Sequence, residues 1–141
     1  MTDDRHAVIV DQWLVKSPAL RNRAFLALFQ RTLDGLWRRA RTTLGEVTLI
    51  AISERVLYDA TERFPALSAV KVATDGIRCD GAREQLEALP RDELRAAARA
   101  VLAGWLRVLG NLTGDVLTPA LHEELGRVAP ATDDPEKDPS P

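Results

Sequence analysis

The feature that most constrains the fold is the stretch from Pro18 to Leu44, where apolar residues recur at helical spacing. They follow one another at intervals of three or four residues, with one adjacent pair, and this period of about 3.6 indicates a long amphipathic helix. Ser17 suits the capping position, Pro18 suits the first turn, and Gly45 is a typical terminator. Such a helix needs other elements against which to bury its stripe. The stripe consists of Phe25, Phe29, Leu33, Leu36, Trp37, Ala40 and Leu44.

The rest of the chain supplies further segments with the helical period. Apolar residues recur every three or four positions from Leu49 to Phe64, and Pro65 ends this segment. A strand over 47–52, followed by a helix that Ser53 caps, is the competing interpretation of the region. Residues 7–15 are apolar and partly β-branched, a pattern too short to decide between a strand and a helix. The other predicted helices are 82–89, a long one from Pro90 to Leu109 that Gly110 ends, and one that begins at Val116 or Thr118 and ends at Gly126.

The middle of the chain changes its period to two. Residues 70–72 and 77–79 each alternate between apolar and polar side chains, and Asp75-Gly76 between them is a typical tight-turn dipeptide. We therefore predict a small β-hairpin across residues 69–80. Because a lone hairpin is only marginally stable, this one is expected to pack against the helices. Its inward side chains would be Val70, Val72, Ile77 and Cys79.

Together these elements predict a mainly α fold, a compact bundle of four to five helices with a small β-hairpin inserted near the middle, at about residues 69–80. No break in composition divides the bundle, so residues 1–128 are expected to form a single globular domain. Residues 129–141 hold four of the eight prolines and no apolar side chain larger than alanine. Because such a segment buries too little surface to offset its ordering entropy, we expect a disordered acidic tail.

The formal net charge of −2 is a sum of unlike parts. Residues 129–141 carry four acids and one lysine, a charge of −3, which leaves +1 for residues 1–128 from 18 bases and 17 acids. Residues 18–44 carry +5, from six arginines and one aspartate. A nearly neutral body, without aromatic residues interleaved on its basic side, is atypical of nucleic-acid binding, so no nucleic-acid partner is expected.

The residues that usually carry catalysis or bind metals are scarce. Neither a G-x-x-x-x-G-K nor a G-x-G-x-x-G phosphate loop occurs, and the glycines occur singly along the chain. We interpret His6 and His122 as surface histidines, and Cys79 as a small apolar residue that faces the helices. A single cysteine also excludes an internal disulfide and a thiolate-rich zinc site. We therefore expect a non-enzymatic protein with no catalytic residues, no cofactor and no metal site.

One face of the predicted helix 18–44 is a candidate docking surface. At about 100° per residue its arginines gather opposite the apolar stripe, and a guanidinium group matches carboxylates with two parallel hydrogen bonds. Trp37 lies at the edge of the stripe, and tryptophan and arginine dominate the binding energy of many interfaces. The competing interpretation is a solvated face that pairs with the acids Glu54, Asp59 and Glu62, with Trp37 in the core. The predicted partner-binding residues are Arg31, Trp37, Arg38 and Arg41.

These observations favour a non-enzymatic bacterial regulatory or signalling adaptor, which binds the acidic surface of a protein partner through the arginine-rich helix. The alternative is a small-molecule sensor with an apolar pocket between the helices and the hairpin. The bacterial origin rests on the preference for arginine over lysine, 16 to 3, which is typical of a GC-rich genome. Residues 1–10 lack the basic start and long apolar core of a secretory signal, and no apolar stretch approaches the about 20 residues of a membrane span. We therefore expect a cytoplasmic protein without a membrane partner. Besides the complex with a protein partner, the sequence is compatible with a homodimer.

Overall fold

The computed structural model describes residues 5–15, 21–113 and 116–127. Within these ranges the chain is mainly α-helical, with one antiparallel hairpin in the middle, so the predicted fold class is confirmed. The predicted tail, residues 129–141, and the predicted cap at Ser17 and Pro18 lie outside the described residues. In chain order the elements are α1 (Arg5–Val15), α2 (Asn22–Leu44), α3 (Glu46–Arg63), the 3-10 turn η1 (Pro65–Ala69), β1 (Lys71–Ala73), β2 (Gly76–Arg78), the 3-10 turn η2 (Asp80–Ala82), α4 (Arg83–Glu87), α5 (Arg91–Thr113) and α6 (Thr118–Arg127).

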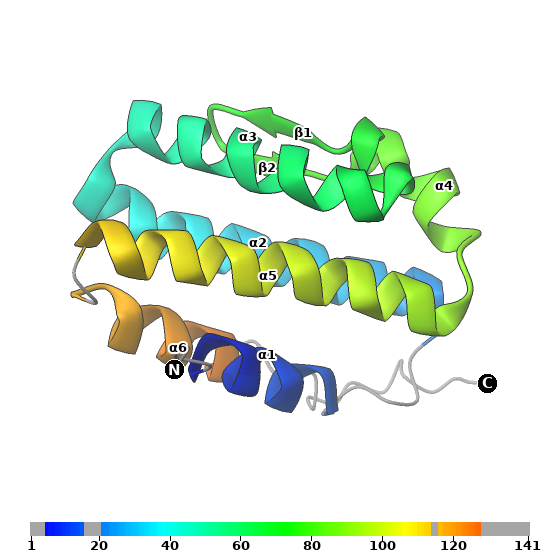
Figure 1. Ribbon diagram of the computed structural model, residues 1–141, viewed down its shortest axis with the longest axis horizontal. Helices are drawn as coiled ribbons and strands as arrows, with labels where there is room; N and C mark the ends of the chain where they lie inside the picture. The colour runs from blue at the N-terminus through cyan, green and yellow to red at the C-terminus, as the bar shows by residue number, and fades with distance from the viewer. Residues whose placement is uncertain (1–4, 16–20, 114–115, 128–141) are drawn as a thin grey trace.

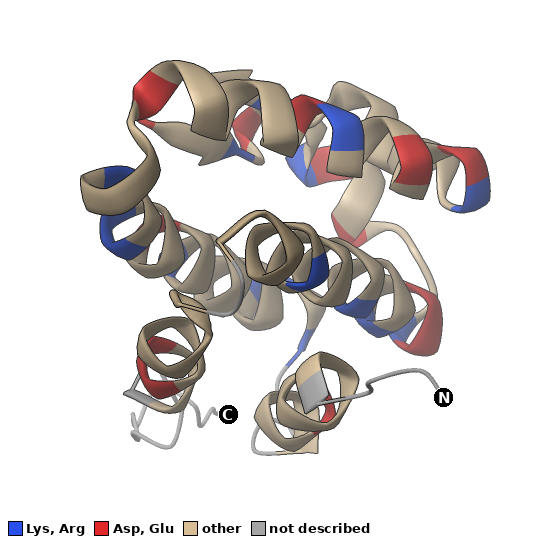
Figure 2. Cartoon of the chain, turned by 60° about the vertical axis from the view of Figure 1, so that its left-hand side comes forward, with Lys and Arg blue, Asp and Glu red and all other residues tan. Residues whose placement is uncertain are grey.

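The helices lie in three layers (Figure 1). The long helices α2 and α5 run through the middle, α3 with the hairpin and α4 covers one side, and α1 with α6 covers the other. Figure 2 shows the same three layers from a second direction. α5 packs against both α1 and α3, while α2 packs against both α6 and β2. Each central helix therefore contacts both outer layers, which explains why the two carry the widest apolar stripes.

The junction of α2 and α3 follows the signals in the sequence. Gly45 ends α2 with a φ of +84°, a left-handed conformation that glycine adopts without the steric cost of a Cβ atom. α3 begins directly afterwards, at Glu46, so the competing strand over 47–52 is not formed. At the far end Phe64 caps α3 before Pro65, which cannot continue a helix. The tight connection sends α3 back along the layer formed by α2 and α5.

Residues 7–15, which the sequence left undecided, belong to α1. The ring of Trp13 tilts against the rings of Phe25 and Phe29 on α2, with centroids 5.6 and 6.4 Å apart. Trp13 is only 2% exposed. The helical conformation is thus selected by tertiary packing on α2, because the short apolar pattern alone is compatible with either structure.

Two predicted helix ends are wrong. α2 begins at Asn22 rather than Pro18, because Arg21 has an extended backbone. α5 continues beyond Gly110 to Thr113. Gly110 is buried there, and a glycine inside a helix costs only about 1 kcal/mol relative to alanine, so packing against neighbouring helices can keep the helix intact.

The hairpin forms one residue out of step with the predicted turn. Val72 pairs with Ile77 and Ala73 pairs with Gly76, so the two-residue turn is Thr74-Asp75 rather than Asp75-Gly76. Gly76 lies inside β2 with a φ of +143°, a conformation that disfavours any residue with a Cβ atom. The predicted inward set is confirmed in the main: Val70, Ile77 and Cys79 are buried and Val72 is half-buried.

The core contains one buried polar contact that links α3 to α5. The indole Nε1–H of Trp105 donates to Ser53 Oγ at 2.8 Å, and both side chains are fully buried. A buried donor without an acceptor is costly, so this bond fixes which face of α3 meets α5. The surrounding residues of the same core are apolar.

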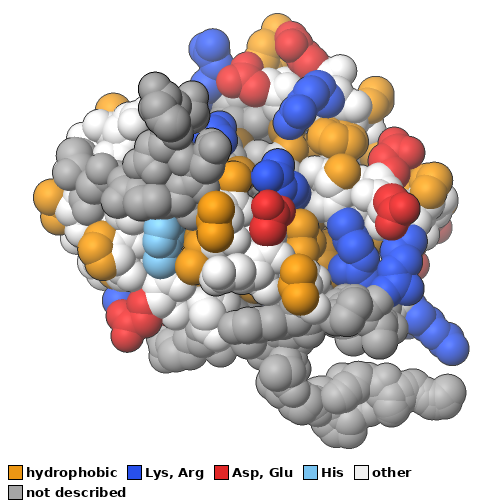
Figure 3. All heavy atoms as spheres, turned by 60° about the horizontal axis from the view of Figure 1, so that its bottom comes forward, with side chains coloured by type: hydrophobic (Ala, Val, Ile, Leu, Met, Phe, Trp, Pro, Cys, Tyr) orange, Lys and Arg blue, Asp and Glu red, His pale blue; other side chains and the backbone are white. Residues whose placement is uncertain are grey.

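The outer face that α1 and α6 form carries a mixed surface. Where the described residues are visible on this face, hydrophobic side chains appear as spots between charged and neutral groups (Figure 3). None of the helices that the structure describes combines the length and the apolar character needed to cross a bilayer.

Candidate functional site

α2 leaves one strip of its surface exposed. The helix packs against α6, β2, α3, α4 and α5, yet Arg31, Arg38 and Arg41 remain exposed on it. At about 100° per residue these three side chains lie within an arc of about 80°. They extend over about 15 Å of the helix axis. We call these three residues the arginine strip, and Figure 2 shows the basic residues recurring along this helix.

The strip is unpaired within the described part of the chain. None of its three guanidinium groups forms an ion pair or a hydrogen bond with another described residue. The alternative pairing with Glu54, Asp59 and Glu62 of α3 is not formed, and Asp59 instead accepts from Arg55 on its own helix at 3.3 Å. The strip therefore presents uncompensated positive charge to the solvent.

The charged residues beside the strip already have partners. On the hairpin side Asp34, the one acid of α2, accepts hydrogen bonds from Arg78 at 3.4 Å and from Gln30 at 2.9 Å. On the other side Arg39 donates to the buried carboxylate of Glu124 on α6 at 3.2 Å. Because the neighbouring carboxylates are occupied by other cations, they do not neutralise the strip.

Trp37, the fourth predicted partner-binding residue, is not part of the exposed face. It is only 3% exposed and packs in the core beneath the hairpin, where its ring lies 3.9 Å from the position that a Cβ atom would take on Gly76. Its indole nitrogen has no hydrogen-bond partner in the described structure. Covered by the hairpin, this tryptophan cannot contact a partner at the surface, so the partner-binding assignment of Trp37 is corrected to a core role.

The two histidines meet between α1 and α6. His6 Nδ1 lies 3.1 Å from His122 Nε2, and the rings form an edge-to-face contact with centroids 5.2 Å apart. His6 is only 5% exposed, so its interpretation as a surface histidine is wrong, while His122 is half-buried. Across the described ranges, no three His, Cys, Asp or Glu side chains gather as a set of metal ligands. The observed role of the pair is thus to join the first helix to the last.

Cys79 is buried beside α2 and takes no part in the strip. Its backbone N–H donates to Gln30 Oε1 at 3.0 Å. Burial, together with the negative charge of Asp80, raises the pKa of the thiol to about 12. Since the thiolate is the reactive form of cysteine, the thiol is chemically inert near neutral pH.

A pocket lies close to where the sensor hypothesis places one. It has a volume of about 140 Å³ and lies between α2 and the segment that follows the hairpin. Four charged residues line it, namely Arg23, Asp80, Arg83 and Glu87. The lining thus combines these four charged residues with apolar ones such as Leu26 and Ala27, and the sensor hypothesis stays a prediction. A wider groove of about 380 Å³ lies between α3 and β1, beside the exposed ring of Tyr58.

The sequence pattern predicts the three exposed arginines of the strip but not the pocket. The strip was visible as a helical period, whereas the pocket joins Arg23 to Arg83 across sixty positions of sequence, which no local pattern records. Comparisons of the chain with family models, with curated proteins and with solved structures found no match. The function must therefore be inferred from the chemistry of the described residues.

Proposed function

We propose that this chain is a non-enzymatic bacterial adaptor, of a regulatory or signalling type, that binds an acidic protein surface through the arginine strip. The observation that supports the proposal most is the state of Arg31, Arg38 and Arg41: exposed on one face of a central helix and unpaired among the described residues. Carboxylates of a partner would gain charge-assisted, bidentate hydrogen bonds there. No ion pair between described residues would have to break first.

The spacing of the strip suggests the shape of the partner surface. Arg38 and Arg41 are about one helical turn apart, and Arg31 lies about two turns before Arg38. Acidic side chains at matching intervals on a partner helix would meet all three at once. Because α2 is held by packing against both outer layers, the three Cα positions are ordered before binding, which lowers its entropic cost.

The proposed partner is a different protein rather than a second copy of this chain or a nucleic acid. Across a two-fold axis the strip would face the strip of the other copy, and like charges opposed at an interface repel. The formal net charge of −2 disfavours binding to a polyanion. A homodimer would use another face of the molecule. The compartment that we propose is the cytoplasm.

The proposal is tested by comparing two triple charge reversals. The strip variant carries R31E, R38E and R41E, and the control carries R55E, R91E and R107E, which are exposed arginines outside the strip. Both variants change the net charge equally, so any general effect of charge is matched. Circular dichroism and thermal unfolding first establish that both variants keep the fold.

Quantitative affinity purification from lysate of the source organism then identifies proteins retained by the wild type. We expect a retained protein with an acidic surface that the control also binds and the strip variant loses by about 100-fold in affinity, since each reversed rim charge costs about 1 kcal/mol. Rising salt should weaken the same complex. Equal retention by the two variants, or equal loss from both, would refute the strip as the docking surface.

A further inference from the structure

The pocket lies between α2 and α4, and side-chain–backbone hydrogen bonds join its two sides at both ends. At one end Asn22 Nδ2 donates to the backbone carbonyls of Glu87 and Leu89, at 3.1 and 2.8 Å. At the other end Gln30 donates to the carbonyl of Ile77 at 2.9 Å and accepts from the N–H of Cys79 at 3.0 Å. The distance between the two sides of the pocket is thus set by the fold, and a ligand would not have to change it on binding.

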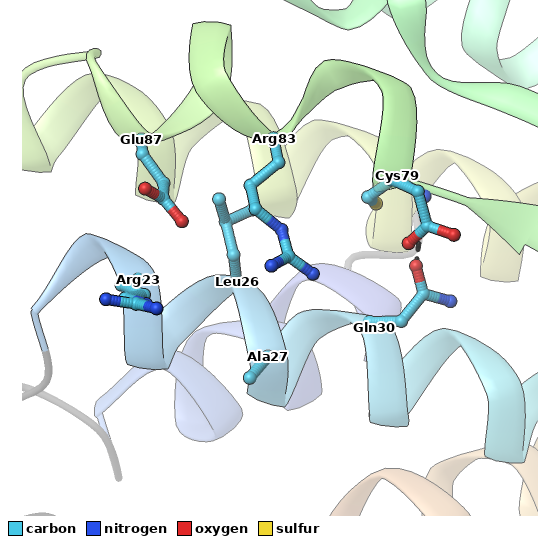
Figure 4. A pocket seen from close by; sticks show the side chains of 8 residues that line it. Arg23, Leu26, Ala27, Gln30, Cys79, Arg83 and Glu87 are labelled. Atoms are coloured by element: carbon cyan, nitrogen blue, oxygen red, sulfur yellow. Dashed lines mark hydrogen bonds between the residues drawn. The ribbon is translucent and has the colours of Figure 1, made fainter.

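Charged side chains of both signs line this opening (Figure 4). Arg23 comes from α2 and Arg83 from α4, so guanidinium groups reach the pocket from opposite walls. Asp80 and Glu87 supply two carboxylates. Within the described ranges, none of these four side chains forms an ion pair with another. All four charged groups are therefore available to a ligand.

The rest of the lining is uncharged. It consists of Leu26, Ala27 and Gln30 on α2 and of Cys79, whose thiol stays protonated near neutral pH because its pKa is about 12. The volume of about 140 Å³ is close to that of engineered cavities of about 150 Å³ that accept a molecule of benzene's size. The pocket thus suits a ligand of about six non-hydrogen atoms.

We propose that this pocket binds a small zwitterion that carries one carboxylate and one ammonium group. The carboxylate would lie between Arg23 and Arg83, and the ammonium group would face Asp80 or Glu87. The four lining charges sum to zero, so a simple anion would be attracted by the arginines and repelled by the acids. A zwitterion uses both kinds of group, and this inference is independent of the arginine strip.

The test uses L-alanine, which has about six non-hydrogen atoms, as the probe. The full chain is labelled with ¹⁵N, and the amide signal of Cys79, which lies in the pocket wall, reports binding in heteronuclear NMR spectra. At constant ionic strength we expect a saturable shift with a dissociation constant on the order of 1 mM, an affinity well within the limit for a ligand of this size. Acetate carries only the carboxylate and methylammonium only the ammonium group, so each should bind about tenfold more weakly than alanine or not at all.

Variants locate the site. The pairs R23Q/R83Q and D80N/E87Q should each weaken alanine binding by about tenfold. R55Q/R107Q is the matched control, because it removes two exposed arginines outside both the pocket and the arginine strip, and it should leave the shift unchanged. A titration without a saturable shift at Cys79 overturns the proposal. Binding of acetate as tight as that of alanine, or equal loss in R55Q/R107Q, overturns it as well.

Discussion

Replacing Ser53 by alanine removes the only acceptor that the described structure assigns to the buried indole N–H of Trp105. Both side chains are fully buried, so water cannot replace the hydroxyl group. An unsatisfied buried donor costs about 1–3 kcal/mol, and alanine recovers about 0.5 kcal/mol of helix propensity in α3. We therefore expect the free energy of unfolding to fall by about 1–2 kcal/mol.

The measurement is urea unfolding followed by far-ultraviolet circular dichroism, with thermal unfolding beside it. For a domain of this size the expected change lowers the melting temperature by about 4–8 °C. Ser68→Ala is the control, because Ser68 is exposed and its loss should change stability by less than about 0.5 kcal/mol.

A double-mutant cycle with Trp105→Phe separates the hydrogen bond from the packing of the ring. We expect a coupling energy of about 1 kcal/mol between the two positions. If Ser53→Ala is as stable as the wild type and the cycle shows no coupling, the described packing of α3 against α5 is wrong.

Three further predictions concern single positions. Gly35→Ala should destabilise the fold by about 1–3 kcal/mol, because its Cβ atom would lie 2.6 Å from Glu124 Oε2, and this carboxylate is buried and paired with Arg39 at 3.2 Å, so it cannot move aside without losing that contact. Gly104→Ala, whose Cβ atom would lie 3.5 Å from a valine methyl of α3, should instead stabilise the fold by about 0.5–1 kcal/mol, and urea unfolding compares the two. Gly76→Ala should cost about 1–3 kcal/mol in the same assay because its φ is +143°, and a stability equal to the wild type would contradict the described hairpin. The thiol of Cys79 has a pKa of about 12 in the folded chain, against an ordinary value of 9.0. Because the thiol of the unfolded chain therefore ionises first, the stability of the wild type relative to Cys79→Ala should fall as the pH rises from 9 to 12. A stability difference that stays constant over this range would contradict the buried thiol.

The long helices could be predicted because their apolar periods continue over many turns. A stripe such as the one from Phe25 to Ala40 fits no other regular structure, and Gly45 and Pro65 mark the ends of α2 and α3 chemically. α1 could not be predicted, because its helical form depends on the contact of Trp13 with α2. The alternating pattern predicts the hairpin but places its turn one residue too late, because Gly76 belongs to β2 rather than to the turn.

The candidate site shows the same division between local and long-range information. Exposure of the strip follows from the helical period of α2, which is a local property. The ion-pair partners of the neighbouring charges cannot be predicted from this period, because they lie on other elements: Arg39 pairs with Glu124 of α6 and Asp34 pairs with Arg78 of β2. Likewise the burial of Trp37 depends on the hairpin that folds over it, and no spacing in the sequence encodes that contact.

The most direct test of the docking strip is a charge swap between Arg38 and the partner captured by affinity purification. R38E alone should weaken the complex by about fivefold, and a reversal of the facing acid on the partner to arginine should weaken it similarly. With both changes together the ion pair re-forms in the opposite sense, so we expect the affinity to return to within about threefold of the wild type. Losses that simply add, with no recovery for any acid on the partner, would contradict direct contact through the strip.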